Sequence, residues 1–131
     1  MNDASSSVPL GPHESAVFDV AGAVLTPLPL DPAQVVSGAP TTAYAVLDVS
    51  ADGRVERGIW EHTPGVTTDV EADELFVVVS GRATVEVDGG VGVPGGSTLE
   101  LRPGVVGILR AGAKTTWTVH ETLRKVWQTT A

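Results

Sequence analysis

The chain of 131 residues contains no cysteine. Disulfide frameworks, thiolate metal sites and cysteine nucleophiles are therefore excluded together. A serine nucleophile is not indicated either, because the sequence has no Gly-x-Ser-x-Gly elbow and no serine beside a suitable histidine. The glycine-rich residues 89–96 (GGVGVPGG) fall in an expected hairpin rather than between a strand and a helix, so they do not predict a phosphate-binding loop.

Basic residues are also scarce. The sequence has 8 lysines and arginines against 16 aspartates and glutamates, which gives a net charge of −8 and an isoelectric point near 4.6. This balance argues against nucleic-acid binding and against docking on anionic membranes, because both need basic patches. The simplest interpretation of such an acidic surface is that it keeps the protein soluble.

Long apolar runs are missing. No run approaches the ~20 residues that a membrane-spanning helix needs, so we expect no membrane segment. The N-terminus lacks the basic segment and apolar stretch of a signal peptide. We therefore expect a cytoplasmic protein.

Glycine and proline, in contrast, are plentiful, with 15 and 9 copies, and no segment shows helical periodicity. Together with the abundance of valine and threonine, this predicts an all-β fold with many short strands and frequent turns. The length suits one domain, which we expect over residues 16–131. Residues 1–15 are small, polar and broken by prolines, so they predict a disordered or loosely ordered arm.

Alternation and turn residues divide the chain into about ten strands. The expected strands cover residues 16–25, 42–49, 54–62, 66–70, 74–79, 82–87, 98–101, 105–109, 115–119 and 123–128. Residues 26–40 contain four prolines and predict an irregular connection. Antiparallel strands with turn signals every 8–12 residues are typical of a sandwich or a jelly-roll barrel.

Residues 74–81 (ELFVVVSG) form the most informative segment. The run from 74 to 79 is short and rich in valine, which predicts a strand buried on both faces. A charge at its head is costly unless something pairs with it or solvates it. Glu74 is therefore expected to point into a lined cavity, where the function should be sought.

A family resemblance begins at the same segment. Residues 58–60 (GIW), 64–65 (PG), Glu74 and Gly81 resemble, in this order, the first motif of the cupins. The closing residues 117–127 (WTVHETLRKVW) are similar to those of the small ureidoglycine aminohydrolase-like cupins. The resemblance implies a single cupin barrel, which is a double-stranded β-helix or jelly-roll β-sandwich. It also implies a homodimer, to which the apolar residues 16–25 could contribute by crossing to a partner.

The chain departs from the cupin pattern at the metal ligands. Most metal-dependent cupins use a His-x-His pair, a glutamate and a third histidine. Here these positions hold Thr67 and Asp69 (or residues 68–70 under a spacing one residue shorter), Glu74 and Thr115. Transition metals prefer imidazole or thiolate ligands, commonly three or more. We therefore expect no tightly bound cofactor, and at most a weak divalent metal at Glu74 and Asp69.

Three residues are candidates for acid–base chemistry. Burial would raise the pKa of Glu74 and make it a proton carrier near neutral pH, although Glu74 could instead be a structural remnant bonded to threonines or to an arginine. Asp69 shares the barrel interior with Glu74 if the longer spacing holds; otherwise it lies at a loop edge in water with Glu71 and Asp73. His62 is a third catalytic candidate, or a strand-end histidine bonded to the backbone.

Aromatic and hydroxyl side chains are expected to line the cavity. Strand alternation places Trp117 on one face with Thr115 and Val119, and places Trp60 on one face with His62. Aromatic walls with a few polar groups are typical of small-molecule pockets, but they also occur in ordinary barrel cores. The candidate ligand-binding residues are Trp60, Thr67, Phe76, Thr115, Trp117 and Tyr44.

The basic pair Arg124 and Lys125 alternates, so one side chain faces inward and the other outward. The inward cation would neutralise a glutamate or capture an anionic ligand, and a structural salt bridge to Glu121 is the favoured role. Which of the two faces the interior is not determined by the pattern.

The expected function is binding or transformation of a small organic metabolite inside the barrel, without a tightly held metal. Isomerisation, elimination and cyclisation need only proton transfer and are the reactions favoured. Two alternatives stay open. One is a metal-dependent hydrolase or oxygenase, and the other is a non-catalytic ligand-binding or accessory protein.

Overall fold

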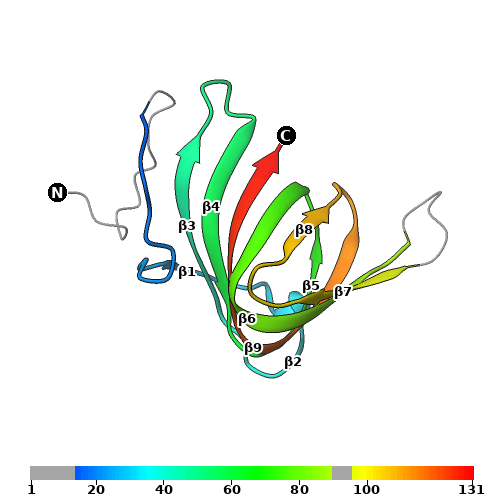
Figure 1. Cartoon of the computed structure of the whole chain (residues 1–131). Helices are drawn as coiled ribbons and strands as arrows, with labels where there is room; N and C mark the ends of the chain where they lie inside the picture. The colour runs from blue at the N-terminus through cyan, green and yellow to red at the C-terminus, as the bar shows by residue number, and fades with distance from the viewer. Residues whose placement is uncertain (1–13, 90–95) are drawn as a thin grey trace.

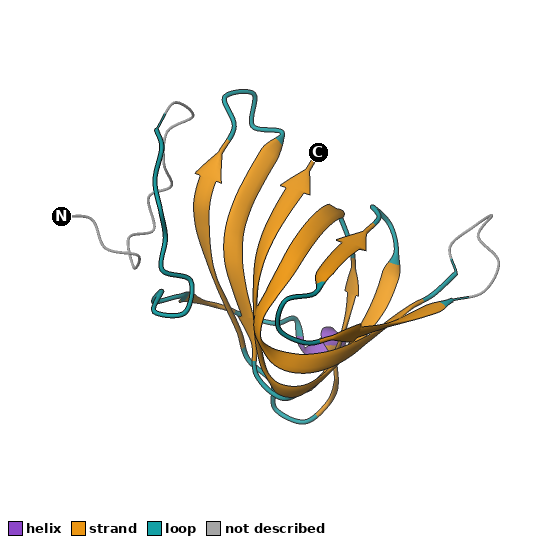
Figure 2. Ribbon diagram, viewed as in Figure 1, coloured by secondary structure: helices purple, strands orange, loops and turns teal. Residues whose placement is uncertain are grey.

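The computed structural model describes residues 14–89 and 96–131. In this part of the chain, nine strands and one short 3-10 helix, η1 (Pro32–Gln34), form a curled, open-ended barrel (Figures 1 and 2). The strands are β1 (Thr26–Leu28), β2 (Val35–Ser37), β3 (Thr42–Val49), β4 (Val55–His62), β5 (Gly65–Val70), β6 (Asp73–Val87), β7 (Ser97–Leu101), β8 (Val106–Leu109) and β9 (Lys114–Thr130).

The two longest strands build the barrel. β6 and β9 pair antiparallel along their whole length and belong to two sheets at once. One sheet runs β1-β3-β4-β9-β6-β8, and the other runs β2-β5-β9-β6-β7. Two antiparallel sheets that share bent strands make a jelly-roll sandwich, which confirms the predicted all-β architecture.

The bend in β6 is centred on Gly81. The register between β6 and β9 shifts around this point, and Gly81 has a φ of +89°. This left-handed conformation favours glycine, and a Cβ atom here would also collide with the backbone of Thr122 in β9. The glycine that closes the motif is therefore the corner at which β6 passes from one sheet to the other.

The core lies between the two sheets and is made mainly by alternate residues of β6 and β9, together with Leu101 of β7 and Leu109 of β8. Phe76 and Val78 are buried, whereas Leu75 on the opposite face of β6 is 44% exposed. The prediction that residues 74–79 are buried on both faces is therefore wrong. An antiparallel barrel covers only one face of its strands, so the valine-rich run presents part of its apolar surface to the outside.

The N-terminal residues differ from the prediction. Residues 16–25 form no strand; they lie along the outside of the barrel (Figure 1), where the Arg124 guanidinium donates to the carbonyls of Val20 (2.7 Å), Ala21 (3.3 Å) and Ala23 (3.0 Å). The prediction of an outer strand is wrong because a side chain, rather than a neighbouring strand, satisfies this backbone. Ala23 is buried, whereas most of residues 16–25 are exposed.

Two other expectations need correction, and several are confirmed. The connection at residues 26–40 contains β1, η1 and β2 rather than irregular chain, since Pro27 lies in an edge strand and Pro32 at the start of the 3-10 helix, where proline is tolerated. The separate strands predicted at 74–79 and 82–87 are halves of β6, and those at 115–119 and 123–128 are halves of β9.

β3 is confirmed as predicted, and β4, β5, β7 and β8 agree with the predicted bounds to within one residue. The predicted arm at 1–15 lies almost entirely outside the described residues.

No helix in the described ranges, 14–89 and 96–131, is long and apolar enough to cross a membrane.

Candidate functional site

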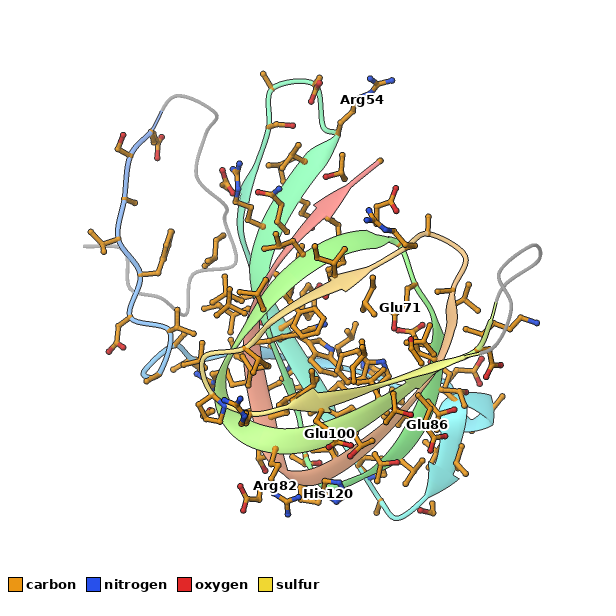
Figure 3. All side chains as sticks on the ribbon, turned by 45° about the vertical axis from the view of Figure 1, so that its right-hand side comes forward. Arg54, Glu71, Arg82, Glu86, Glu100 and His120 are labelled. Atoms are coloured by element: carbon orange, nitrogen blue, oxygen red, sulfur yellow. The ribbon has the colours of Figure 1, made fainter. Side chains whose placement is uncertain are left out.

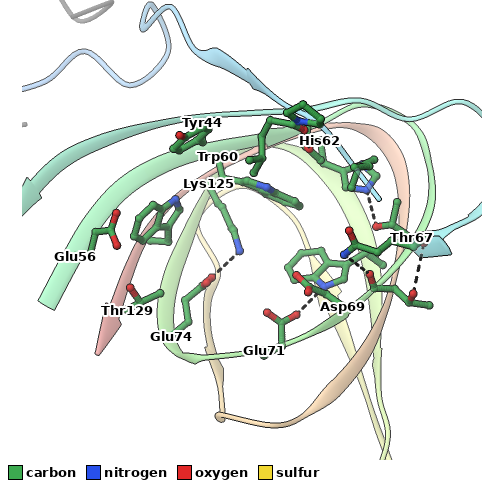
Figure 4. A pocket seen from close by; sticks show the side chains of 18 residues that line it. Tyr44, Glu56, Trp60, His62, Thr67, Asp69, Glu71, Glu74, Lys125 and Thr129 are labelled. Carbon is green, nitrogen blue, oxygen red and sulfur yellow. Dashed lines mark hydrogen bonds and ion pairs between the residues drawn. The ribbon is translucent and has the colours of Figure 1, made fainter. Parts of the chain in front are cut away.

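A pocket of about 400 Å³ opens into the barrel between the two sheets (Figure 4). The pairing register determines which residues line the pocket, because residues paired across neighbouring strands project to the same side of a sheet. Three pairs of lining residues that include a residue of β9 face inward in this way. They are Glu56↔Thr129, Trp60↔Lys125 and, across β5 and β9, Thr67↔Trp117.

An ion pair lies in the middle of this pocket. The Lys125 ammonium donates to the Glu74 carboxylate at 2.6 Å, and the two side chains are only 6% and 11% exposed. Lys125 belongs to β9 and Glu74 to the neighbouring β6. The buried carboxylate thus has a direct cationic partner, which offsets the cost of its desolvation.

Aromatic rings surround the ammonium. Lys125 Nζ lies 4.6 Å from the centre of the Trp60 ring, 4.7 Å from Phe76 and 4.8 Å from Trp117. Trp60 also packs edge-on against Trp117 at 5.4 Å. The negative faces of aromatic rings attract cations, so the rings and Glu74 together hold a positive charge in the barrel interior.

His62 is fully buried and uses both ring nitrogens. Nδ1 lies 2.6 Å from the Thr63 carbonyl and Nε2 lies 2.9 Å from the Thr67 hydroxyl. A carbonyl only accepts, so Nδ1 carries the proton and Nε2 accepts from Thr67. Burial lowers the pKa of His62, and repulsion from Lys125 acts in the same direction while the bond to Thr63 opposes it. His62 is therefore a neutral histidine, bonded to the backbone as the structural alternative predicted.

Glu71 enters the pocket from the short connection between β5 and β6. Its Oε2 atom accepts hydrogen bonds from the Thr115 hydroxyl at 2.6 Å and from the Trp117 indole at 3.1 Å. The indole also lies 3.1 Å from the Thr115 hydroxyl. Three side chains thus hold one another in a fixed arrangement, in which Glu71 projects toward the cavity (Figure 4).

Asp69 lies at the edge of the pocket, at the end of β5. The residue is exposed, yet the pocket wall still desolvates its carboxylate. This desolvation raises the pKa of Asp69, repulsion from Glu71 and Glu74 raises it further, and a bond from the Val70 backbone and the charge of Lys125 oppose the rise. Asp69 therefore shares the cavity with Glu74, as the longer motif spacing predicted, while it keeps contact with solvent.

The structure brings most of the predicted site residues together. Seven of the nine line the pocket, namely Tyr44, Trp60, His62, Thr67, Asp69, Glu74 and Trp117. The other two stand behind its wall: Phe76 is fully buried beneath Lys125, and Thr115 is buried and supports Glu71. No hydrogen bond links Glu74 to a threonine or an arginine within the described residues, since its partner is Lys125.

Sequence reasoning missed several lining residues. The sequence pattern indicates Glu71 only as a solvated loop residue, since nothing within its own segment distinguishes it from Asp73. Glu56, Trp127 and Thr129 were not singled out, although strand alternation places Trp127 and Thr129 on the same face as Lys125. Gln34 and Thr68 were also missed, because η1 was predicted as irregular chain.

The side chains of the basic pair Arg124 and Lys125 point to opposite faces of β9. Lys125 faces the interior, and Arg124 faces outward, where its guanidinium pairs with Glu61 at 3.1 Å. The predicted salt bridge to Glu121 is wrong. Glu121 is exposed beyond the bend of β9, whereas Glu61 lies opposite Arg124 in the paired strand β4.

Comparison with known proteins agrees with this architecture. Residues 49–127 match the family described as the EutQ-like cupin domain. No curated protein matches the sequence. Among solved structures, the chain is similar to ethanolamine utilization protein Q from Salmonella typhimurium LT2, with a TM-score of 0.57, 16% identity and coverage of 69% of each chain.

Two further solved structures are similar. Ectoine synthase from P. lautus has a TM-score of 0.60 and 18% identity, over 88% of this chain and 78% of that one. A protein of unknown function from Pseudomonas syringae pv. tomato has a TM-score of 0.67 and 27% identity, over 83% of this chain but only 45% of that one, so this chain spans less than half of its length. Because the family match covers more than half of its residues, the protein belongs to the EutQ-like cupin domain family.

Proposed function

We propose that this cupin binds a small organic metabolite in the barrel pocket and needs no tightly held metal ion. The observation that carries the proposal is the pocket itself, a cavity of about 400 Å³ with aromatic walls and a few fixed polar groups. A largely preformed cavity of this composition is typical of small-molecule sites.

The residues at the usual metal positions do not fit a transition-metal ion. The Thr67 hydroxyl is bonded to His62, the Thr115 hydroxyl to Glu71, and the Glu74 carboxylate to the Lys125 ammonium. Within residues 14–89 and 96–131, no group of three or more histidine, aspartate and glutamate side chains is arranged to hold a metal. Transition metals need such donor sets, and a fixed cation beside Glu74 competes with one. The weak divalent site considered at Glu74 and Asp69 would first have to displace Lys125.

The chemistry that we propose is proton transfer, of the isomerase, lyase or cyclase type. A catalytic acid works best when its pKa lies near the operating pH, and Asp69 is the carboxyl whose pKa is raised. Glu74 and His62 complete the proposed set. Glu74 would position the ligand or accept a proton beside Lys125, and His62 would hold the Thr67 hydroxyl in place at the pocket wall.

A non-catalytic binding protein is the second candidate. Its support is that Glu74 and His62 are both engaged within the protein, by Lys125 and by Thr63 and Thr67 respectively. The two candidates predict the same pocket but a different fate for the ligand. A bound metabolite that stays chemically intact favours the binding protein.

Binding is tested first, by screening small metabolites for a rise in melting temperature of the full chain. A metabolite that binds in the pocket should quench tryptophan fluorescence, because Trp60, Trp117 and Trp127 all line the cavity. Asp69→Asn should change its affinity, whereas Asp48→Asn, which alters an exposed ion pair with Arg57 outside the pocket, should not. Ligands unaffected by any pocket substitution would contradict the proposal.

Metal dependence is tested separately, by elemental analysis of the purified protein and by titration before and after treatment with a chelator. We expect less than stoichiometric metal and unchanged ligand affinity. A stoichiometric transition metal whose removal abolishes binding would overturn the metal-free part of the proposal and favour a metal-dependent hydrolase or oxygenase.

Catalysis is tested with a metabolite identified by the screen. Glu74→Gln should lower turnover about 100-fold, the usual contribution of an acid–base group, while ligand binding persists. Glu61→Gln is the matched control, since Glu61 is also paired with a basic residue of β9 but on the outer side of the sheet. Equal turnover in Glu74→Gln and the control would remove Glu74 from the catalytic role.

Three finer assignments belong to the same proposal. Within the cupins, we propose that the chain belongs to the ureidoglycine aminohydrolase-like group. The support is the closing segment 117–127, in which Arg124 pairs with Glu61 and Lys125 pairs with Glu74. The absence of cysteine favours a cytoplasmic location. The third assignment is a homodimer.

A further inference from the structure

The charges around the pocket are unbalanced. Four carboxylates line it, from Glu56, Asp69, Glu71 and Glu74, against the single ammonium of Lys125. Lys125 and Glu74 neutralise each other at 2.6 Å, and His62 is neutral. The carboxylates of Glu56, Asp69 and Glu71 have no lysine or arginine partner among the lining residues, so these negative charges repel one another around one cavity. An anionic ligand would be repelled here, whereas a cation would relieve the repulsion.

Glu71 is built as a rigid acceptor. Both of its hydrogen bonds, from Thr115 and Trp117, go to Oε2. A carboxylate offers about four acceptor positions, so this arrangement fixes the side chain and leaves acceptor capacity for a ligand. Figure 3 shows Glu71 inside the open end of the barrel, whereas Glu86 and Glu100 lie on its outside.

The pocket already holds one organic cation, which belongs to the protein. The Lys125 ammonium lies against Trp60, Phe76 and Trp117 and is bonded to Glu74. Two more aromatic residues, Tyr44 and Trp127, line the cavity away from that contact. Carboxylates combined with aromatic faces are the means by which proteins recognise alkylammonium groups.

From the charge excess, the fixed Glu71 and the aromatic walls, we infer that the ligand of this pocket is a small organic cation, with an alkylammonium group held by Glu71 and Asp69. This inference rests on the proposed function and specifies its substrate class. Glu71 is the residue that determines specificity, because Thr115 and Trp117 fix its position.

The experiment compares three probes of nearly equal shape by isothermal titration calorimetry with the full chain. Choline is the cation, 3,3-dimethylbutan-1-ol is its neutral isostere, and 3,3-dimethylbutanoate is the anion. We expect choline to bind at least about tenfold more tightly than the alcohol, because cation–π attraction and Coulomb attraction to the carboxylates act only on the charged group. The anion should bind least, and added salt should weaken choline alone.

Glu71→Gln tests the anchor while keeping the shape of the side chain. The variant should lose about tenfold in choline affinity without change in its affinity for the alcohol. Glu86→Gln removes an exposed carboxylate on the outer face of the same barrel and should bind all three probes as the unmodified protein does. Circular dichroism and melting temperature check that both variants fold.

The outcomes separate the two proposals. If the alcohol or the anion binds in the pocket as tightly as choline does, the inference of a cationic ligand is overturned while the proposed small-molecule pocket stands. Equal loss in Glu71→Gln for choline and the alcohol would overturn the role of Glu71. Absence of binding by all three probes counts against the inference and, together with a negative metabolite screen, against the proposed function.

Discussion

Lys125 and Glu74 are the residues on which the interior of this barrel depends most. A carboxylate at the head of a buried strand is costly, and here the cost is offset by a cation from the adjacent strand at 2.6 Å. The same ammonium packs against three aromatic rings. The pair therefore contributes to the stability of the fold as well as to the chemistry of the pocket.

Substitution of Lys125 tests how much the ion pair contributes to the stability of the fold. Lys125→Met keeps most of the length of the side chain but leaves Glu74 without its partner, so we expect a loss of about 3 kcal/mol in the free energy of unfolding. Urea denaturation at pH 7 measures it. Arg57→Met is the matched control, because its ion pair with Asp48 is 49% and 24% exposed and should change stability by about 1 kcal/mol or less. Similar losses in both variants would argue against a special role for the interior pair.

His62 should make stability depend on pH. Its pKa is lowered in the folded state, so below the ordinary value of 6.5 the unfolded chain binds a proton that the folded chain does not. Stability is therefore fully present above pH 6.5 and falls as the pH drops below it, by at most about 1.4 kcal/mol per pH unit. Asp69, whose pKa is raised, acts with the opposite sign, since its folded form takes up a proton first.

The measurement is urea unfolding of the unmodified protein and of His62→Gln at pH 7.5 and 5.5. The decrease in the free energy of unfolding from pH 7.5 to pH 5.5 should be smaller in His62→Gln than in the unmodified protein, even if the variant is less stable at both pH values. In addition, ¹⁵N spectra at pH 7.5 should show His62 as the neutral Nδ1-protonated tautomer. An equal pH dependence in the two proteins would contradict the neutral, buried state of His62.

At the scale of elements, the continuous strands β6 and β9 decide the architecture. Each was predicted as two strands, because the sequence signals at the bends resemble turns. The chain instead turns a corner without breaking, which allows one strand to pair with β4 and β5 in succession. This corner depends on Gly81, whose left-handed φ and contact with Thr122 leave no room for a side chain.

Gly81→Ala should destabilise the fold by about 3 kcal/mol or more, since left-handed strain and a backbone collision add together. Gly104→Ala is the control: its φ is +90°, but nothing lies within 4 Å of the added Cβ atom. It should lose only the conformational part, about 1–2 kcal/mol. Thermal unfolding of the two variants measures the difference, and a smaller loss in Gly81→Ala than in the control would show that the corner can relax.

At the scale of the whole molecule, the expected homodimer stays a prediction. Static light scattering with size-exclusion chromatography should give twice the chain mass of 13.5 kDa at micromolar concentration. A dimer is expected because apolar side chains are exposed on the outer face of β6 and β8, and a partner could cover them. They include Leu75, Val106 and Ile108. A mass of one chain at all concentrations would contradict the dimer and leave the pocket, which lies within one chain, unaffected.

The sequence by itself determined the class of the fold, most strand positions and much of the site. Alternation is a local property with a period of two residues, so it predicted correctly that Thr115, Trp117 and Val119 share a buried face. The longer of two possible motif spacings, taken from the family resemblance, also allows Asp69 and Glu74 to share one cavity, and both line the pocket. These results needed no knowledge of which strands are neighbours.

The tertiary structure alone decided how the charges are partnered. Lys125 meets Glu74, Arg124 meets Glu61, and Glu71 meets Thr115 across 51, 63 and 44 residues of sequence, respectively. Such contacts depend on strand pairing and register across the barrel, and a shift of one residue would exchange the inward and outward faces. For that reason the sequence predicted a cavity with a charge in it, while the fold determined that this charge is neutralised by Lys125 and that the unbalanced carboxylates include Glu71.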